Sequence, residues 1–302
     1  MSEERYNNLR KVIGTLKSRR AGAPPENAKI MLFIMGGAMR GIWSIAQLKA
    51  LLEYGYSFDV VVGNSVGAPV AAYYLAGERN FEAGLNFFFD EVPKRIKPLR
   101  FWKIIDIEGI IDALRQGECA LDLKAVKRNP AQFFAEVADS AKKYHLLDVK
   151  EYGIDALKAA ISIRILGGKP VGVAGAEYVD GGAYHQLPLG DLIKRFKPTD
   201  ILILPNVREK EMNTPGINQM ISALKEMLGG KKSSWETRKA IELNMRKNAL
   251  CASRLYRPEV NTAVLYPPET TKVSLLETKR STLLKAYEQT LHETRKVLQL
   301  NE

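Results

Sequence analysis

The sequence contains only two cysteines and three histidines among its 302 residues. The two cysteines, Cys119 and Cys251, provide neither a disulfide framework nor the spacing of a metal site, and a reducing compartment fits such a composition. No uninterrupted apolar stretch approaches the roughly 20 residues that a membrane-spanning helix needs. The sequence therefore argues against disulfide-rich, zinc-binding and integral membrane proteins.

Low-complexity linkers and internal repeats are also missing. The first 20 residues are charged and lack an apolar centre, so they do not resemble a secretory signal. With 46% hydrophobic residues the chain can bury a large core. We expect a cytoplasmic protein with one α/β domain over 28–302, a basic N-terminal extension over 1–27, and helical insertions around 81–155 and 207–260.

Positive charge is in excess, with a formal net charge of +11, which favours anionic partners. One segment combines cations with aromatic rings: Lys94, Arg95, Lys97, Arg100 and Lys103 surround Phe101 and Trp102. Such a mixture suits peripheral contact with an anionic membrane surface. It also suits single-stranded nucleic acid, and a solvated loop with two buried rings is the simplest alternative.

Hydrophobic periodicity predicts strand, helix, strand and helix at 28–37, 41–55, 58–64 and 65–77. This βαβ order indicates a parallel sheet. Residues 81–155 read as helical pieces broken by prolines. Further strands are expected at 159–168, 176–182, 199–206 and 261–268, and further helices at 218–230, 235–250 and 281–300. The fold class is therefore α/β, a three-layer α/β/α arrangement with a mostly parallel central sheet.

The stretch Gly63-Asn64-Ser65-Val66-Gly67 fits G-x-S-x-G, the nucleophile elbow. In such an elbow a tight strand-to-helix turn exposes the serine hydroxyl, and the glycines avoid clashes that a β-carbon would cause. The helix that follows directs its N-terminal amides at the reaction centre. A serine that only caps a helix is the alternative.

A second small-residue turn, Met35 to Gly41, follows the first predicted strand and opens a helix. Clustered small residues let backbone N–H groups approach an anion, as an oxyanion hole requires. Arg40 can add charge there or hold the loop. The alternative is a dinucleotide phosphate loop, with Asp59 near a ribose-binding spacing, although Ala38 stands where that fingerprint has its second glycine.

A third motif, Asp180-Gly181-Gly182, ends a predicted strand. An acidic side chain in this place can accept the proton of a serine hydroxyl. Asp-Gly-Gly is also an ordinary turn sequence.

Together the three motifs resemble the patatin-like phospholipase family. The resemblance covers about 28–77 and 176–206. The glycine-rich turn of the family reads G-G-G-x-R-G, and here Ala38 replaces its third glycine, a change that slightly narrows the anion pocket. The acidic motif is followed by "AYHQLPL", in which Pro188 matches the family's proline with a small shift.

The resemblance implies a Ser–Asp dyad, with Ser65 as nucleophile and Asp180 as base, and no metal or cofactor. It implies an oxyanion hole drawn from Gly36, Gly37, Ala38, Arg40 and Val66. Structural glycines are expected at Gly41, Gly63, Gly67, Gly181 and Gly182. A conventional triad that includes His185 remains an alternative.

The function expected from these motifs is hydrolysis of fatty acyl esters of lipids, of phospholipase A or lysophospholipase type. The expected partners are an acyl-ester substrate such as a phospholipid and an anionic membrane surface. Hydrolysis of small soluble esters and a nucleotide- or lipid-binding protein without activity are the alternatives. Nucleic-acid binding is suggested by charge alone, and no recognition motif supports it.

Overall fold

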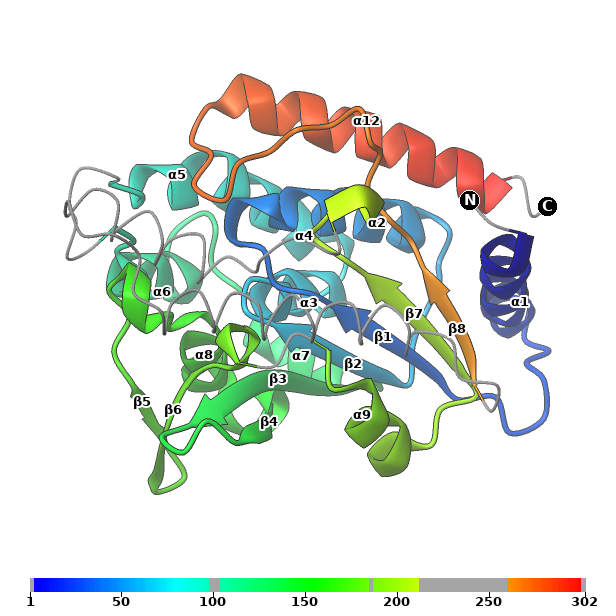
Figure 1. Ribbon diagram of the computed structural model, residues 1–302, viewed down its shortest axis with the longest axis horizontal. Coiled ribbons are helices and arrows are strands. Elements are labelled where there is room, and N and C mark those ends of the chain that lie inside the picture. The colour runs from blue at the N-terminus through cyan, green and yellow to red at the C-terminus, as the bar shows by residue number, and fades with distance from the viewer. Residues whose placement is uncertain (1–2, 98–103, 185–186, 212–259, 300–302) are drawn as a thin grey trace, which may run out of the picture.

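The computed structural model describes residues 3–97, 104–184, 187–211 and 260–299. A central sheet lies between helices on its two faces, as Figure 1 shows. This arrangement confirms the predicted fold class. The expected helices at 218–230 and 235–250 lie outside the described residues.

The sheet has eight described strands in the order β5-β6-β3-β2-β1-β7-β8, with β4 paired to β3. Pairing is parallel from β3 through β2, β1 and β7 to β8, and antiparallel where β3 meets β4 and β6 and where β5 meets β6. The strands are β1 (Ile30–Ile34), β2 (Val60–Asn64), β3 (Gln132–Asp139), β4 (Tyr144–Asp148), β5 (Val171–Val173), β6 (Ala176–Asp180), β7 (Asp200–Leu204) and β8 (Asn261–Val264).

Most of the described helices lie on one face of the sheet, and α9 covers the other (Figure 1). Their bounds are α1 (Glu3–Arg20), α2 (Gly41–Glu53), α3 (Gly67–Leu75), α4 (Glu78–Asn86), α5 (Val92–Lys94), α6 (Ile107–Arg115), α7 (Leu123–Arg128), α8 (Val149–Ile161), α9 (Leu189–Phe196) and α12 (Arg280–Gln299). The long α12 packs along α2.

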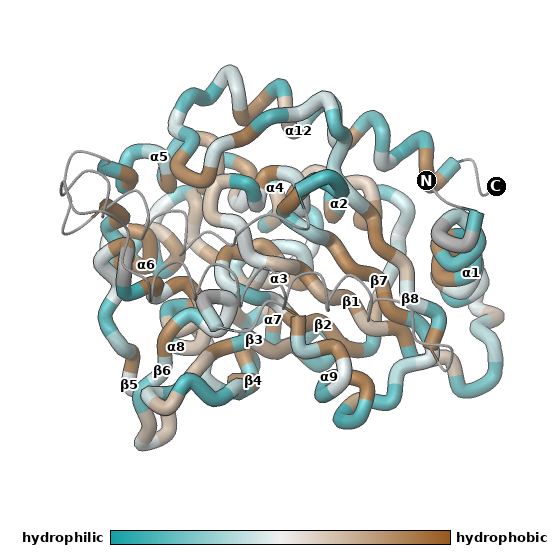
Figure 2. The backbone as a smooth tube through the Cα atoms, viewed as in Figure 1, coloured by the Kyte–Doolittle hydropathy of each residue, from teal (hydrophilic) through white to brown (hydrophobic). Residues whose placement is uncertain are grey.

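The strands at the centre are apolar on both faces, which is why they read as continuous hydrophobic runs. In β1 the side chains of Leu32 and Ile34 enter the larger core, whereas Met31 and Phe33 enter the smaller core beneath α9. Figure 2 shows the hydrophobic colour concentrated on these strands and the hydrophilic colour on the outer turns of the helices.

The described part of the N-terminal extension, from residue 3 onward, packs against the sheet. Helix α1 contacts β8 and buries an apolar stripe at helical spacing, made by Leu9, Val12, Ile13 and Leu16. At its end Arg19 pairs with Asp59 at 2.7 Å. Its basic side chains thus accompany a packed helix, which composition alone did not indicate.

Strands β2 and β6 meet end to end along one edge of β3. Residues 134–138 of β3 pair with β4 on the other edge. Asn64, the last residue of β2, pairs with Glu136, and Asp180, the last residue of β6, pairs with Val137. Two strand ends that are distant in the sequence therefore face consecutive residues of one strand.

Two expectations about secondary structure were wrong. Residues 132–148, expected to be helical, form β3 and β4. Residues 159–168, expected to be a strand, form the end of α8 and a short 3₁₀ turn. Their β-branched residues favour a strand by propensity, but helix α8 packs against β3, β5 and β6 and tertiary contacts prevail. The expected strands at 176–182, 199–206 and 261–268 and the helix at 281–300 are confirmed.

Candidate active site

Ser65 occupies the turn between β2 and α3 and has a left-handed backbone, with φ of 50°. A left-handed conformation is strained for a residue with a β-carbon. The two glycines that flank the Ser65 turn, Gly63 and Gly67, have no room for a side chain. A β-carbon on Gly63 would lie 2.5 Å from the backbone nitrogen of Ala68, and one on Gly67 would overlap the carbonyl oxygen of Ile34. This is the geometry of a nucleophile elbow.

The loop after β1 passes directly against this turn. A β-carbon on Gly36 would lie 2.7 Å from the β-carbon of Ser65, and one on Gly37 would lie 2.5 Å from Cβ of Asn206. Gly41, the first residue of α2, faces Val66 in the same way, at 3.1 Å from its methyl groups. The glycines that the sequence singled out are therefore the ones that let two backbones approach each other.

The Gly36 loop and the start of α3 both adjoin Ser65. The N–H of Met39 donates to Leu275 O (3.1 Å) and that of Arg40 donates to Gly37 O (3.0 Å), so these two are already used. Ala38 has φ of 47° and lines the pocket that contains Ser65. Val66, at the N-cap of α3, belongs to the helix end where N–H groups lack intrahelical partners.

The turn at Asp180 lies beside the Ser65 turn. Oδ1 of Asp180 accepts a hydrogen bond from the Gly182 N–H at 2.8 Å, and the residue is 1% exposed. A β-carbon on Gly182 would overlap Oδ1 of Asn64, the neighbour of Ser65. The structure thus brings the Ser65 and Asp180 motifs together through Asn64 and through β3.

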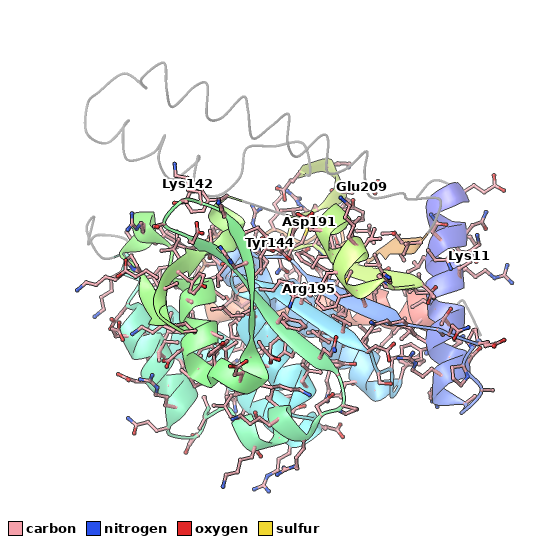
Figure 3. All side chains as sticks on the ribbon, turned by 90° about the horizontal axis from the view of Figure 1, so that it is seen from below. Lys11, Lys142, Tyr144, Asp191, Arg195 and Glu209 are labelled. Atoms are coloured by element: carbon pink, nitrogen blue, oxygen red, sulfur yellow. The ribbon has the colours of Figure 1, made fainter. Side chains whose placement is uncertain are left out.

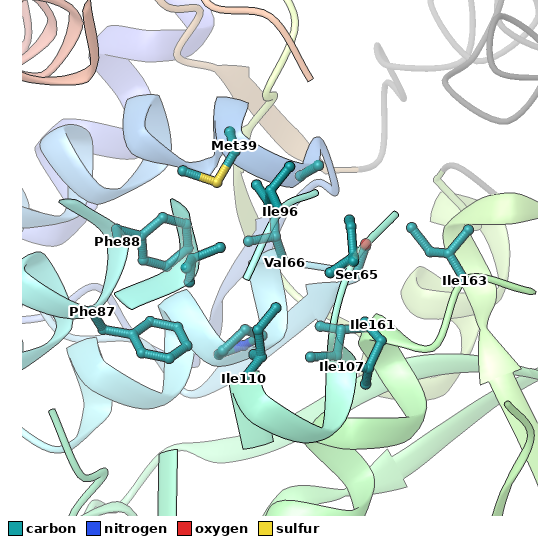
Figure 4. Close-up of a pocket in the computed structure, with 14 residues that line it drawn as sticks. Met39, Ser65, Val66, Phe87, Phe88, Ile96, Ile107, Ile110, Ile161 and Ile163 are labelled. Atoms are coloured by element: carbon teal, nitrogen blue, oxygen red, sulfur yellow. The ribbon is translucent and has the colours of Figure 1, made fainter. Parts of the chain in front are cut away.

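An apolar pocket opens at Ser65. Apart from Ser65, every described residue in its lining is apolar. The lining includes Phe87, Phe88, Ile96, Ile105, Ile107, Ile110, Ile161 and Ile163. In Figure 4, Ser65 and Ile163 lie at one side of the pocket and the two phenylalanines at the other. A lining of this apolar character suits an apolar ligand. Much of the lining comes from residues 87–110.

Arg40 does not line that pocket. Its Nε donates to Val273 O at 3.0 Å, its guanidinium lies over the Trp43 ring at 5.7 Å, and it pairs with Glu211 at 3.6 Å. Of the two roles predicted for Arg40, these contacts fit the one in which it holds the loop.

Three buried polar residues next to the site were missed from the sequence. Asn206 donates from Nδ2 to Met35 O (2.6 Å) and accepts from Ser44 Oγ (2.6 Å), which fixes the start of the Gly36 loop. Asn64 Nδ2 donates to Oε2 of Glu136 at 2.8 Å. In the sequence, each of these residues is marked only as a polar residue at the end or in the middle of an apolar run.

The alternative of a dinucleotide site is not supported by the position of Asp59. Its carboxylate accepts from the Ile30 N–H (2.6 Å) and pairs with Arg19. Asp59 therefore lies where β1 and β2 begin, whereas the Gly36 loop follows the end of β1. Five residues of strand, roughly 16 Å, separate the two.

The histidines take different positions. His185 lies outside the described residues. His145 pairs with Val137 in the β3–β4 ladder and its ring nitrogen Nε2 lies 2.9 Å from Oδ2 of Asp139. His292 is exposed on α12.

The basic and aromatic segment is described only as far as residue 97, so Arg100, Phe101, Trp102 and Lys103 lie outside the described residues. Lys94 and Arg95 both pair with Glu91, at 2.7 and 2.6 Å, and Arg95 also donates to Gly109 O. Within the described residues, no group of three or more His, Cys, Asp or Glu is arranged to hold a metal ion. No helix in these same ranges is long and apolar enough to cross a membrane.

Comparison with known proteins gives a family match and a distant relative. A family model described as patatin-like phospholipase matches residues 32–193. The uncharacterized protein YjjU of Escherichia coli (strain K12) is 22% identical over 188 residues, which cover 60% of this chain and 53% of YjjU. The match thus spans about half the length of that relative.

Two solved structures are similar at low identity. VipD from Legionella pneumophila gives a TM-score of 0.44 at 12% identity, covering 92% of this chain and 68% of VipD. Human GIVD cytosolic phospholipase A2, in complex with methyl gamma-linolenyl fluorophosphonate and terbium chloride, gives a TM-score of 0.42 at 11% identity, covering 100% of this chain and 64% of that one.

Proposed function

The chain belongs to the patatin-like phospholipase family, and on that premise we propose that it is a serine acyl hydrolase that cleaves fatty acyl esters of lipids with Ser65 and Asp180. The family match confirms the resemblance carried by the three sequence motifs. At the level of the family it indicates a lipid acyl hydrolase.

The observation that carries the proposal is the setting of Ser65. Its left-handed backbone holds the hydroxyl at the mouth of an apolar pocket, and the small-residue loop lies against it. A helix-capping serine needs none of these features. A nucleophile that attacks the ester of an apolar acyl chain needs all of them.

In the first step Asp180 takes the proton from Ser65 Oγ while that oxygen attacks the ester carbonyl carbon. The carbonyl oxygen becomes negatively charged and is held by the N–H groups of Gly37, Ala38 and Val66. The intermediate collapses, the C–O bond to the alcohol breaks, and the alcohol leaves with the proton held by Asp180. The products are an acyl-serine ester and the free alcohol or lysolipid.

In the second step a water molecule replaces the alcohol. Asp180 takes one proton from the water, whose oxygen attacks the acyl carbon. Collapse of this intermediate breaks the bond to Ser65 Oγ, which recovers its proton from Asp180. The fatty acid leaves and the enzyme returns to its starting state.

The pocket favours an acyl chain over a small polar ester. Burial of each methylene contributes about 0.8 kcal/mol, and the six isoleucines and two phenylalanines offer such contacts along the pocket. Contact with an anionic membrane surface, which the net charge of +11 suggests, is part of the same proposal.

The proposal is tested by labelling with a fluorophosphonate probe and by hydrolysis of anionic phospholipid vesicles. The variants are Ser65→Ala and Asp180→Asn. Matched controls are Ser57→Ala and Asp112→Asn, which change exposed residues of the same two types. We expect the first pair to lose both signals and the controls to retain them.

Two outcomes would contradict the proposal in different ways. Failure of the folded wild type to label would show that Ser65 is not an activated nucleophile. Labelling at Ser65 with hydrolysis of short soluble esters but not of vesicles would favour the small-ester alternative.

A further inference from the structure

A fully buried carboxyl group, Glu136, lies beside the site in the middle of β3. Its Oε2 accepts a hydrogen bond from Asn64 Nδ2 at 2.8 Å. Its Oε1 has no hydrogen-bond partner within the part of the chain that the structure describes. A buried glutamate of this kind is rare, and the two steps proposed above do not use it.

Asn64 stands at the point where all three motifs meet. It precedes Ser65 in the turn. Its Oδ1 would lie 2.6 Å from a β-carbon on Gly36 and would overlap one on Gly182. The orientation of a single carboxamide therefore sets how closely the Gly36 loop and the Asp180 turn approach Ser65.

We propose that Glu136 is a positioning residue of this site, which fixes the carboxamide of Asn64 and thereby holds the serine turn, the glycine loop and the acidic turn together. The inference rests on the proposed function of Ser65. It assigns Glu136 no contact with the substrate. Its role is to keep Asn64 Nδ2 bonded, so that Oδ1 is held against Gly36 and Gly182.

The state of the Glu136 carboxyl group follows from its surroundings. Burial raises its pKa to about 8, the bond from Asn64 opposes the shift, and the Asp180 carboxylate adds to it. Glu136 is therefore a neutral acid near pH 7. A neutral carboxyl group can remain in the interior at a much smaller desolvation cost than a carboxylate.

The polar groups that interact with Glu136 come from three strands, and they are Asn64 on β2, Asp180 on β6 and Tyr144 on β4. Asp180 and Tyr144 interact with it electrostatically. Asp191 and Arg195 on α9 lie beyond Tyr144, and Figure 3 shows the three together on the side of the sheet that α9 covers. Burial raises the pKa of the Tyr144 phenol, so Tyr144 stays neutral while Glu136 titrates.

Ionisation of Glu136 puts a second negative charge beside Asp180 in the protein interior. Such a charge is costly unless the surroundings rearrange. The carboxylate attracts Asn64 Nδ2 more strongly than the neutral acid does, so the relief comes from water that enters around the charge. Entry of water beside Asn64 would loosen its contacts with Gly36 and Gly182. We therefore expect the reactivity of Ser65 to fall as the pH rises through about 8.

The test is the rate of fluorophosphonate labelling from about pH 6 to 9.5 in the full chain, a range that brackets the titration of Glu136. Glu136→Gln keeps an acceptor for Asn64 and cannot ionise. Glu136→Met keeps the approximate size and removes the acceptor. We expect Glu136→Gln to label at neutral pH at about the wild-type rate and to lose the alkaline fall. We expect Glu136→Met to label about 10- to 100-fold more slowly, the effect of leaving one buried group unpaired.

An alkaline fall of equal size in Glu136→Gln and the wild type would overturn the inference, as would labelling of folded Glu136→Met at the wild-type rate. If Glu136→Met does not fold, the pH profile of Glu136→Gln decides alone. Failure of the proposed function gives a different pattern, because the wild type itself would then not label at any pH, and the inference would fall with it.

Discussion

Gly67 lies so close to Ile34 that a β-carbon on the glycine would overlap the carbonyl oxygen of the isoleucine. Gly67 begins α3, and Ile34 ends β1. The first strand and the helix after the serine are therefore in backbone contact. This contact places the amides of the Gly36 loop next to Ser65, so the second glycine of the elbow serves the oxyanion loop as well as the turn.

Replacement of Gly67 by alanine tests this contact. We expect Gly67→Ala to lower the free energy of unfolding by about 1–3 kcal/mol, the usual effect of overpacking, and to slow fluorophosphonate labelling. Gly14→Ala is the control, because a β-carbon there meets nothing within 4 Å and alanine favours the helix by about 0.5–1 kcal/mol. Urea unfolding and labelling rates measure both effects. Equal stability of Gly67→Ala and Gly14→Ala would show that a β-carbon fits between residue 67 and Ile34.

Ala38 offers a test of backbone strain. Its φ of 47° is unfavourable for alanine by about 1–2 kcal/mol, whereas glycine has about 0.4–1 kcal/mol more unfolded-state entropy to lose. We expect Ala38→Gly to leave stability unchanged or raised by about 1 kcal/mol, with labelling retained. Ala83→Gly, in α4, should lower stability by about 1 kcal/mol. Equal destabilisation of the two variants in thermal unfolding would contradict the strain at Ala38.

Glu136 should make stability depend on pH. Its pKa is about 8 in the fold and 4.5 in its ordinary state. Between these values the folded chain binds the proton and the unfolded chain does not, so stability falls as the pH rises from 4.5 to 8 and levels off above. The fall amounts to at most about 5 kcal/mol. The loss of stability comes from the desolvated charge of the Glu136 carboxylate, so it disappears when residue 136 cannot ionise.

The measurement is urea unfolding at several pH values for the wild type, Glu136→Gln and Glu177→Gln, the last changing an exposed glutamate. We expect the stability of Glu136→Gln relative to the wild type to rise between about pH 5 and 8. Glu177→Gln should follow the wild type throughout. Parallel curves for all three proteins would show that Glu136 does not hold its proton in the fold.

The pocket should set the length of the acyl chain. Ile110 lines it from α6, and a phenylalanine there would fill space that a long chain needs. We expect Ile110→Phe to lower kcat/KM for twelve-carbon esters by about tenfold relative to four-carbon esters. Ile193→Phe, on α9 across the sheet, should leave that ratio unchanged. An unchanged ratio in Ile110→Phe would place the acyl chain elsewhere.

Local sequence patterns predicted the parts of the site that depend on local backbone geometry. Gly63, Ser65 and Gly67 form one turn, so their spacing already contains the geometry. The strands before and after them are continuous apolar runs, which are readable because both faces of the sheet are covered. The motif at Asp180 was found in the same way, as a strand that ends in two glycines.

The parts that depend on contacts between distant segments were not predictable. Strand β3 was not predicted because Glu136 interrupts its apolar run. Only the fold brings Asn64 within hydrogen-bond distance of that glutamate. Residues 161 and 163 looked like a strand because isoleucine favours one, but they lie at the end of a helix and just beyond it, where they line the pocket. Asn206 acquires its role only when β7 lies beside β1.

The most direct test of the central claim is to identify the residue that becomes acylated. The protein would be mixed with a long-chain p-nitrophenyl ester, quenched in acid within the first turnover, digested and analysed by peptide mass spectrometry. We expect the acyl mass on Ser65 in the wild type and no adduct in Ser65→Ala. An adduct on another residue, or ester hydrolysis that persists in Ser65→Ala, would contradict the assignment of Ser65 as the nucleophile.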